Sequence, residues 1–217
     1  MACVPRAVRY LHAMADGAAQ LSFFSAAGSS PVVEDLAGVL CGPGQVVRRG
    51  NTARISVVLV DGWRIAALRD ELALRGVDGE VHTAGPADGW SGPAGAAHSV
   101  RTPFASALAP LGAGWADTGS GKRVPSPMQL TGGTLRLWCI VSGRPWASGF
   151  MLGLGERDEP CWEPLGAALR EAGLLATLVG PRGDGPAYRI LRGRRLARLA
   201  ELVGDPPAGA PEDAWPG

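Results

Sequence analysis

The chain has 217 residues, 46% of them hydrophobic and 19% charged, which is ordinary for a globular protein with one large domain or two small ones. No apolar run approaches the roughly 20 residues that cross a bilayer, so we expect a soluble protein without a membrane partner. The formal net charge of +1 argues against tight non-specific binding to nucleic acid, which requires a strongly basic surface.

The basic residues are unusual in kind, because only Lys122 is a lysine and the other 20 of the 21 are arginines. An excess of arginine is typical of a GC-rich genome, although a planar guanidinium also suits phosphate and base contacts better than an ammonium does. The four cysteines and three histidines form no CxxC or HxxxH pair. We therefore expect neither a zinc site nor a disulfide framework, and we assign no metal ligand.

The N-terminal segment, residues 1–31, has two interpretations. It carries Arg6, Arg9 and a single acid, Asp16, and it ends in a Ser/Ala-rich stretch, which is the composition of an organelle transit peptide. The alternative is an extra helix over 4–20 that packs on the domain. A transit peptide implies a mitochondrion or plastid, whereas the extra helix is compatible with a bacterial cytoplasm.

In the first half, hydrophobic periodicity switches between helical and strand patterns, with Gly and Pro at the switches. The predicted elements are, in order, a helix over 32–40, strands over 45–49 and 53–60, a helix over 63–75, strands over 77–83 and 99–102, and a short helix over 104–111. Ser29-Ser30-Pro31 precedes the first helix as a cap and first turn. Gly50-Asn51-Thr52 predicts a hairpin turn between the first two strands.

The second half repeats this order of elements. It is predicted to contain a helix over 134–141, an extended segment over 146–154, a helix over 163–172, strands over 174–179 and 187–191, and a closing helix over 195–203. The strings LRDELALRGV (68–77) and LGAALREAGL (165–174) match side by side. This pattern indicates an internal duplication, although two amphipathic helices can also match by chance. The domain boundaries are then a first repeat over 32–117, a linker over 118–130, a second repeat over 131–204 and a mobile, Pro/Gly/Ala-rich tail over 205–217.

Three segments resemble one protein family. LAGVLCGPGQVVRRGNTARISVVL (36–59) resembles the first signature of LAGLIDADG homing endonucleases, a helix that ends in Gly-acid-Gly followed by a basic hairpin. KRVPSPMQLTGGTLRLWCIVSG (122–143) is similar to the inter-repeat linker and second signature of that family. HSVRTPFASALAPLGAGW (98–115) resembles the last strand and helix of its first repeat. The three segments occur in the family's order and spacing.

The resemblance implies an α+β fold, the LAGLIDADG homing-endonuclease fold, in which two αββαββα repeats are related by a pseudo-two-fold axis and form a saddle-shaped antiparallel sheet. Such a chain is a monomeric pseudo-dimer. Its two signature helices pack side by side, and small residues allow the close approach. Gly38 and Gly42, helped by Ala37, fit this role in the first helix, whereas the second helix has the bulkier Leu137 and Val141.

The resemblance also places the family's metal-binding acids at Pro43 and Ser142, one at the end of each signature helix. A divalent cation needs anionic oxygen ligands, and neither residue supplies one. Glu34 and Asp35 lie roughly 12 Å from Pro43 at a helical rise of about 1.5 Å per residue, and Glu156 follows the second helix only after a whole strand. We therefore expect no catalytic residue and no cofactor, with Mg²⁺ needed only if cleavage is retained.

The family binds DNA with basic residues on its sheet and turns, so the resemblance implies a set of nucleic-acid contacts here. The corresponding residues are Arg48, Arg49, Asn51, Arg54, Arg101, Lys122, Arg123, Arg144, Arg182, Arg189 and Arg192. These arginines can also be solvated strand residues paired with Asp and Glu. Trp146 follows Arg144 at the start of a strand, where it can stack on a base or pack within its hairpin.

Three functions remain open from the sequence. The first is a nucleic-acid-binding protein, such as a regulator bound to DNA, on an endonuclease scaffold without cleavage activity. The second is an RNA-binding splicing factor or a structural component of an organellar ribonucleoprotein such as the ribosome. The third is an active endonuclease that depends on a divalent metal.

Overall fold

The computed structural model describes residues 26, 28–116, 121–180 and 185–217. Residues 1–25 lie outside this range, so neither interpretation of the N-terminal segment is tested. Arg182, one of the predicted nucleic-acid contacts, lies outside it as well. Within the described ranges, no helix is both long enough and apolar enough to cross a membrane.

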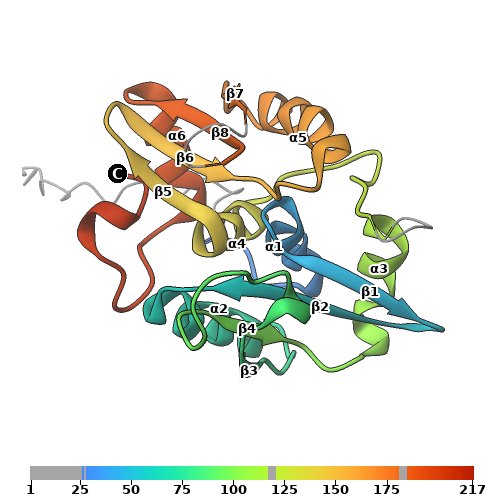
Figure 1. Cartoon of the computed structure of the whole chain (residues 1–217). Helices are drawn as coiled ribbons and strands as arrows, with labels where there is room; N and C mark the ends of the chain where they lie inside the picture. Colours follow the sequence, from blue (N-terminus) through green and yellow to red (C-terminus); the bar gives the residue numbers. More distant parts are fainter. Residues whose placement is uncertain (1–25, 27, 117–120, 181–184) are drawn as a thin grey trace, which may run out of the picture.

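The chain forms a mixed α+β structure with the predicted order of elements (Figure 1). The first half contains η1 (Val33–Leu36), α1 (Ala37–Cys41), β1 (Gln45–Arg49), β2 (Thr52–Leu59), α2 (Gly62–Leu74), β3 (Glu80–Thr83), η2 (Pro86–Asp88), β4 (His98–Arg101), η3 (Ser106–Leu108) and α3 (Ala109–Trp115). The second half contains α4 (Gly132–Ser142), β5 (Gly143–Trp146), β6 (Gly149–Gly153), α5 (Glu159–Glu171), β7 (Thr177–Val179), β8 (Ala187–Leu191), α6 (Arg194–Val203) and η4 (Glu212–Ala214).

The strands form two antiparallel four-stranded sheets with the same strand order, β1-β2-β4-β3 in one and β5-β6-β8-β7 in the other. Figure 1 shows the sheets on opposite sides of α1 and α4, which lie in the middle of the molecule. The alternating burial of β2 places every second side chain in the core, as a sheet with one solvent-exposed face requires. The core therefore lies between the inner faces of the sheets and the helices.

Several element boundaries differ from the prediction, and two of the differences have a clear physical reason. The segment predicted as one extended run over 146–154 is the end of a hairpin, in which β5 pairs with β6 around Ala147 and Ser148. This turn contains no Gly or Asn between its strands, so its composition does not mark it. Helix α5 begins at Glu159, earlier than predicted, because Pro160 occupies its first turn, where the missing amide costs little.

The residues after 204, expected to form a mobile tail, pack against the protein. Trp215 is only 6% exposed, and its indole Nε1 donates a hydrogen bond of 2.8 Å to the Gly204 carbonyl. The Arg136 guanidinium lies over the same ring, 5.3 Å from its centroid. The Pro/Gly/Ala-rich composition suggested mobility, but burial of one large aromatic side chain fixes the segment.

The contact between α1 and α4 depends on glycine. A Cβ atom at Gly38 would lie 2.0 Å from the Thr134 carbonyl oxygen, and one at Gly42 would lie 2.9 Å from the Ser142 hydroxyl. Leu137 and Val141 also face these two glycines. The bulkier second helix is therefore accommodated because the first helix presents no side chain at the contact.

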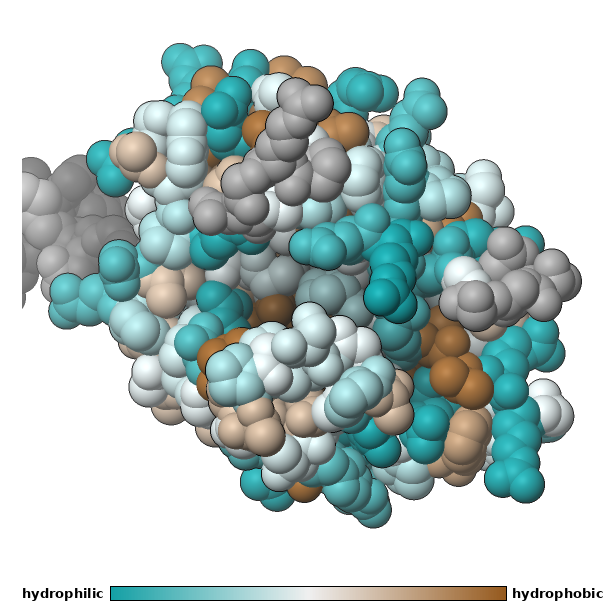
Figure 2. Space-filling model, in the orientation of Figure 1, coloured by the Kyte–Doolittle hydropathy of each residue, from teal (hydrophilic) through white to brown (hydrophobic). Residues whose placement is uncertain are grey.

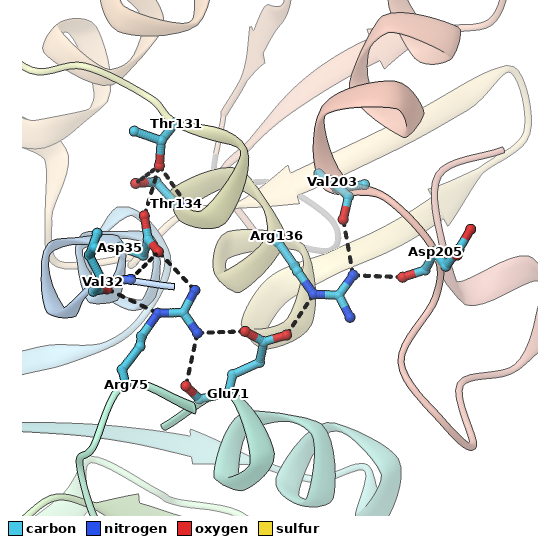
Figure 3. Close-up of polar contacts among 9 residues, drawn as sticks. All are labelled: Val32, Asp35, Glu71, Arg75, Thr131, Thr134, Arg136, Val203 and Asp205. Carbon is cyan, nitrogen blue, oxygen red and sulfur yellow. Dashed lines mark hydrogen bonds and ion pairs between the residues drawn. The ribbon is translucent and has the colours of Figure 1, made fainter. Parts of the chain in front are cut away.

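The N-terminal ends of these helices meet in a buried polar cluster around Asp35 (Figure 3). Asp35 Oδ2 accepts hydrogen bonds from Arg75 Nη2 at 2.9 Å and from the Val32 amide at 3.1 Å. Its other oxygen accepts one from the Thr131 hydroxyl at 2.9 Å. A Cβ atom at Gly133 would lie 2.4 Å from the carboxylate, so this end of α4 also depends on glycine.

Glu71 extends the cluster toward the C-terminal part of the chain. One carboxylate oxygen accepts from Arg75 Nη1 at 2.6 Å, and the other accepts from Arg136 Nε at 2.6 Å. Arg136 Nη1 donates in turn to the carbonyls of Val203 and Asp205, at 3.0 and 2.6 Å. Two carboxylates and two guanidiniums balance in charge, which fixes η1, α2, α4 and the tail in one arrangement without leaving a buried charge unpaired. Asp35 is committed to this cluster.

Candidate nucleic-acid interface

The C-terminal ends of α1 and α4 lie next to each other, since a Cβ atom at Gly42 would lie 2.9 Å from the Ser142 hydroxyl. Pro43, which follows Gly42, has no side-chain ligand for a metal. The Ser142 hydroxyl donates to the Gly153 carbonyl at 2.9 Å, so it is committed within the protein. Among the residues that the structure describes, no group of three or more His, Cys, Asp or Glu side chains could hold a metal ion.

An ammonium group lies at the end of α1. Lys122 Nζ donates to the carbonyls of Gly42 and Gly44, at 2.8 and 2.9 Å, and pairs with Asp158 Oδ2 at 2.7 Å. Its side chain is only 1% exposed. Two carbonyls accept hydrogen bonds from this buried ammonium and Asp158 balances its charge. Lys122 is therefore not placed to hold a nucleic-acid backbone, contrary to what the sequence led us to expect. It binds the C-cap carbonyl of α1 at Gly42 and the carbonyl of Gly44 just beyond the helix, where a positive charge also suits the helix dipole.

A second cation caps α4 in the same way. Arg64 Nη1 donates to the carbonyls of Cys139 and Ile140, at 3.1 and 2.6 Å, and its Nη2 donates to the Gly143 carbonyl at 2.5 Å. Arg64 was not among the residues singled out from the sequence. A signal was present, because Arg64 lies in the first turn of α2, where a positive charge opposes the helix dipole and so points to a tertiary role.

The buried thiols near these helix ends are unreactive as nucleophiles. Cys161 Sγ donates to the Lys122 carbonyl at 3.2 Å, and burial raises the pKa of this thiol to about 11. Burial also raises the pKa of Cys41 and Cys139 far above the usual range of a thiol. All three therefore stay protonated at neutral pH, a form that does not act as a nucleophile.

The outer face of the first sheet carries three of the predicted contacts. Strand pairing places Arg49, Arg54 and Arg101 on the face opposite the core. Arg48 pairs with the buried Ala53 and therefore points to the other face, where it lies against Gly112 of α3. Alternation along β1 thus separates Arg48 from the other arginines of this sheet.

The outer face of the second sheet carries Arg144 and Arg189, which pair with the same residue, Met151, from either side. In the first sheet, Arg101 on β4 pairs with Ser56 on β2, just as Arg189 on β8 pairs with Met151 on β6. Arg101 and Arg189 are therefore placed alike, each on the outer face of the third strand of its sheet.

Two of these arginines stack on aromatic rings. The Arg54 guanidinium lies 4.8 Å from the centre of the Phe104 ring, and that of Arg189 lies 4.5 Å from the centre of the Trp146 ring. A guanidinium held flat on a ring still directs its in-plane N–H groups outward. Such an arginine is oriented in advance for a phosphate or a base edge.

Arg101 is instead paired with an acid of its own chain. It forms an ion pair with Asp88, and its Nε donates to the Ser99 hydroxyl at 3.0 Å. The hydrogen bond from Arg101 holds the pKa of Asp88 below its usual value. The sequence left two roles open for the strand arginines, contact with nucleic acid or pairing with an acid of the same chain. For Arg101 the structure shows the second.

The other predicted contacts lie at the edges of the sheets. Asn51 is exposed in the β1–β2 turn, and Arg192 is exposed directly after β8. Arg123 is exposed as well and donates to the Ala113 carbonyl at 3.0 Å. In the view of Figure 2, the surface is hollowed between the two sheets, and hydrophilic side chains project on both sides of the hollow.

No protein-family model and no curated protein sequence matches the chain. Among solved structures, it is similar to the homing endonuclease I-WcaI, in a structure of that protein bound to its DNA recognition sequence. The similarity has a TM-score of 0.56 at 13% sequence identity, and it covers 78% of this chain and 79% of that one. The chain therefore has a fold like that of a homing endonuclease.

The Asp88–Arg101 pair gives a prediction about charge. Because its lowered pKa keeps Asp88 ionised, the pair is intact at neutral pH and is lost only as the pH falls through that lowered pKa. Replacing Asp88→Asn releases Arg101, which we expect to tighten binding to nucleic acid and to steepen its salt dependence by about one unit. Fluorescence anisotropy over a range of salt concentrations measures both.

The matched control is Glu201→Gln, which makes the same change in charge at an exposed pair with Arg198 on α6. We expect it to leave the salt slope unchanged. Equal slopes for the two variants would show that Arg101 does not contact the nucleic acid.

Proposed function

We propose that this chain is a nucleic-acid-binding protein built on the LAGLIDADG scaffold, and that it has lost the metal-dependent cleavage of that family. The matching strand orders of the two sheets support two repeats related by a pseudo-two-fold axis. The similar placement of Arg101 and Arg189 supports the same duplication. One chain then supplies both halves of the binding surface as a monomeric pseudo-dimer.

The observation that carries the proposal is the placement of arginine on the outer faces of both sheets. Arg49, Arg54 and Arg101 lie on one, and Arg144 and Arg189 lie on the other. The similar solved protein was determined in a complex with DNA, and the fold here offers nucleic acid a pair of sheets of the same kind. Since the net charge is only +1, binding depends on these local faces and not on the overall field.

The loss of cleavage is supported at the helix ends. Cleavage by two metal ions needs carboxylates from both sides of the scissile phosphate, and the corresponding positions hold Pro43 and Ser142. The Lys122 ammonium binds the carbonyls on either side of Pro43, so a positive charge already lies where a cation would be held. Asp158, a nearby acid that the sequence did not lead us to expect there, is neutralised by the same ammonium.

Binding by the sheets predicts the effect of removing one arginine from each outer face. We expect the double variant Arg49→Gln, Arg189→Gln to bind duplex DNA several-fold more weakly and to lower the salt slope by about two units, one for each phosphate that is no longer neutralised. The control is Arg195→Gln, Arg198→Gln on α6, which removes the same charge away from the sheets. Anisotropy titrations in which both double variants bind with the same reduced affinity would place the binding surface elsewhere.

Loss of the metal site predicts the response to divalent cations. We expect isothermal titration with Mn²⁺ to give no heat beyond dilution for the wild-type protein up to millimolar concentrations. Proline and a neutral hydroxyl next to an ammonium offer a hard cation no anionic ligand. A saturable isotherm with a micromolar dissociation constant would refute the loss of the site.

A further inference from the structure

The outer faces of the two sheets differ in their balance of charge. Strands β5, β6, β7 and β8 contain no Asp or Glu, while Arg144 and Arg189 lie on their outer face. In the first sheet, the residue that pairs with Arg101 on β3 is Glu80, and Arg101 is also bound by Asp88. The strands of the second sheet therefore bring no carboxylate next to Arg189, whereas Arg101 of the first sheet is paired with one.

An aromatic ring lies on the same face as these arginines. Trp146 ends β5, and the residue across from it is Gly149, which adds no side chain beside the ring. Trp146 is half-buried and lies outside the hydrophobic core formed by the described residues. The core therefore does not account for a large aromatic side chain at this position.

The Arg189 guanidinium contacts the Trp146 ring, and its Nε atom is the nitrogen nearest the side-chain stem. Arg189 Nε is buried and has no hydrogen-bond partner among the residues that the structure describes, and the guanidinium lies 4.5 Å from the centre of the ring. Contact with the ring thus compensates for the hydrogen bond to water that the buried Nε–H group of Arg189 no longer makes. The result is a planar, cationic surface built from two side chains on the outer face of the sheet.

We propose that this Trp146–Arg189 stack binds an unpaired base of a single-stranded nucleic acid, an inference that rests on the nucleic-acid-binding function proposed above. Aromatic rings and guanidinium planes stack on bases of any sequence. Within a duplex, each base already stacks between its neighbours, so only an unpaired base can present a free face. Arg144 lies two residues before Trp146 on the same face of β5 and adds positive charge beside the stack.

The test compares a short DNA single strand, its RNA equivalent and the fully paired duplex of the same sequence by fluorescence anisotropy. Trp146→Leu keeps an apolar side chain at this position but removes the stacking surface. We expect this variant to bind both single strands about tenfold more weakly, within the range that one stacked base supplies. The salt slope should stay unchanged because no charge is removed, and duplex affinity should fall much less than single-strand affinity because Arg189 keeps its charge and loses only the ring that orients it. Trp146→Phe, which keeps an aromatic ring, should restore most of the affinity.

The matched control is Trp90→Leu, which removes a half-buried tryptophan of the β3–β4 connection and should leave all three affinities unchanged. Thermal unfolding checks that each variant is folded.

Weaker binding mainly to the single strands supports the proposal, and the more affected strand identifies RNA or DNA as the natural ligand. If Trp146→Leu binds single strands as the wild type does, or loses duplex affinity equally, the stacking site is refuted while the proposed function stands. Failure of the wild type to bind any of the three refutes the proposed function itself.

Discussion

The contact between α1 and α4 determines the rest of this structure. At Gly38 and Gly42 the two helices approach so closely that a single added carbon would meet backbone or side-chain oxygen. Helices packed in this way end at almost the same point, and each leaves its last carbonyls without partners. The protein supplies those partners from elsewhere in the chain, with Lys122 for α1 and Arg64 for α4.

These caps connect the fold to the proposed function. A nuclease of the family that the sequence resembles would hold a metal ion between two acids at this junction, whereas here the ammonium of Lys122 lies there and is balanced by Asp158. At the opposite ends of the same helices, Asp35 and Glu71 are paired with guanidiniums in a neutral cluster. Both ends of the central helix pair are thus fixed by charged side chains of the protein itself.

The sequence predicted the fold well where the pattern was local. The strand alternation and the order of elements are set by neighbouring residues, whereas the role of the glycines in the first helix was expected from the family resemblance. The composition of residues 205–217 was misleading because the burial of Trp215 depends on Arg136 and Gly204, which belong to other elements. The hairpin around Ala147 and Ser148 lacks the turn residues that would have marked it.

The candidate site was predicted only in part, for a physical reason. Which face an arginine occupies depends on strand register, so Arg48 and Arg49, adjacent in sequence, point to opposite faces of the sheet. The role of Lys122 depends on carbonyls about 80 residues away, at Gly42 and Gly44. Such long-range pairs leave no local pattern, and only the packing of the helices brings them together.

The central claim is that the ends of α1 and α4 meet, and a disulfide cross-link tests it most directly. A Cβ atom at position 42 lies 2.9 Å from the side-chain oxygen of Ser142, close enough for the short Cβ–Cβ separation of about 3.5–4.5 Å in a disulfide. We predict that Gly42→Cys combined with Ser142→Cys forms this bond on mild oxidation, seen by mass spectrometry of peptides. The single variants control for pairing with the native cysteines. If both introduced thiols remain open to alkylation after oxidation, the helix ends are apart and the claim is contradicted.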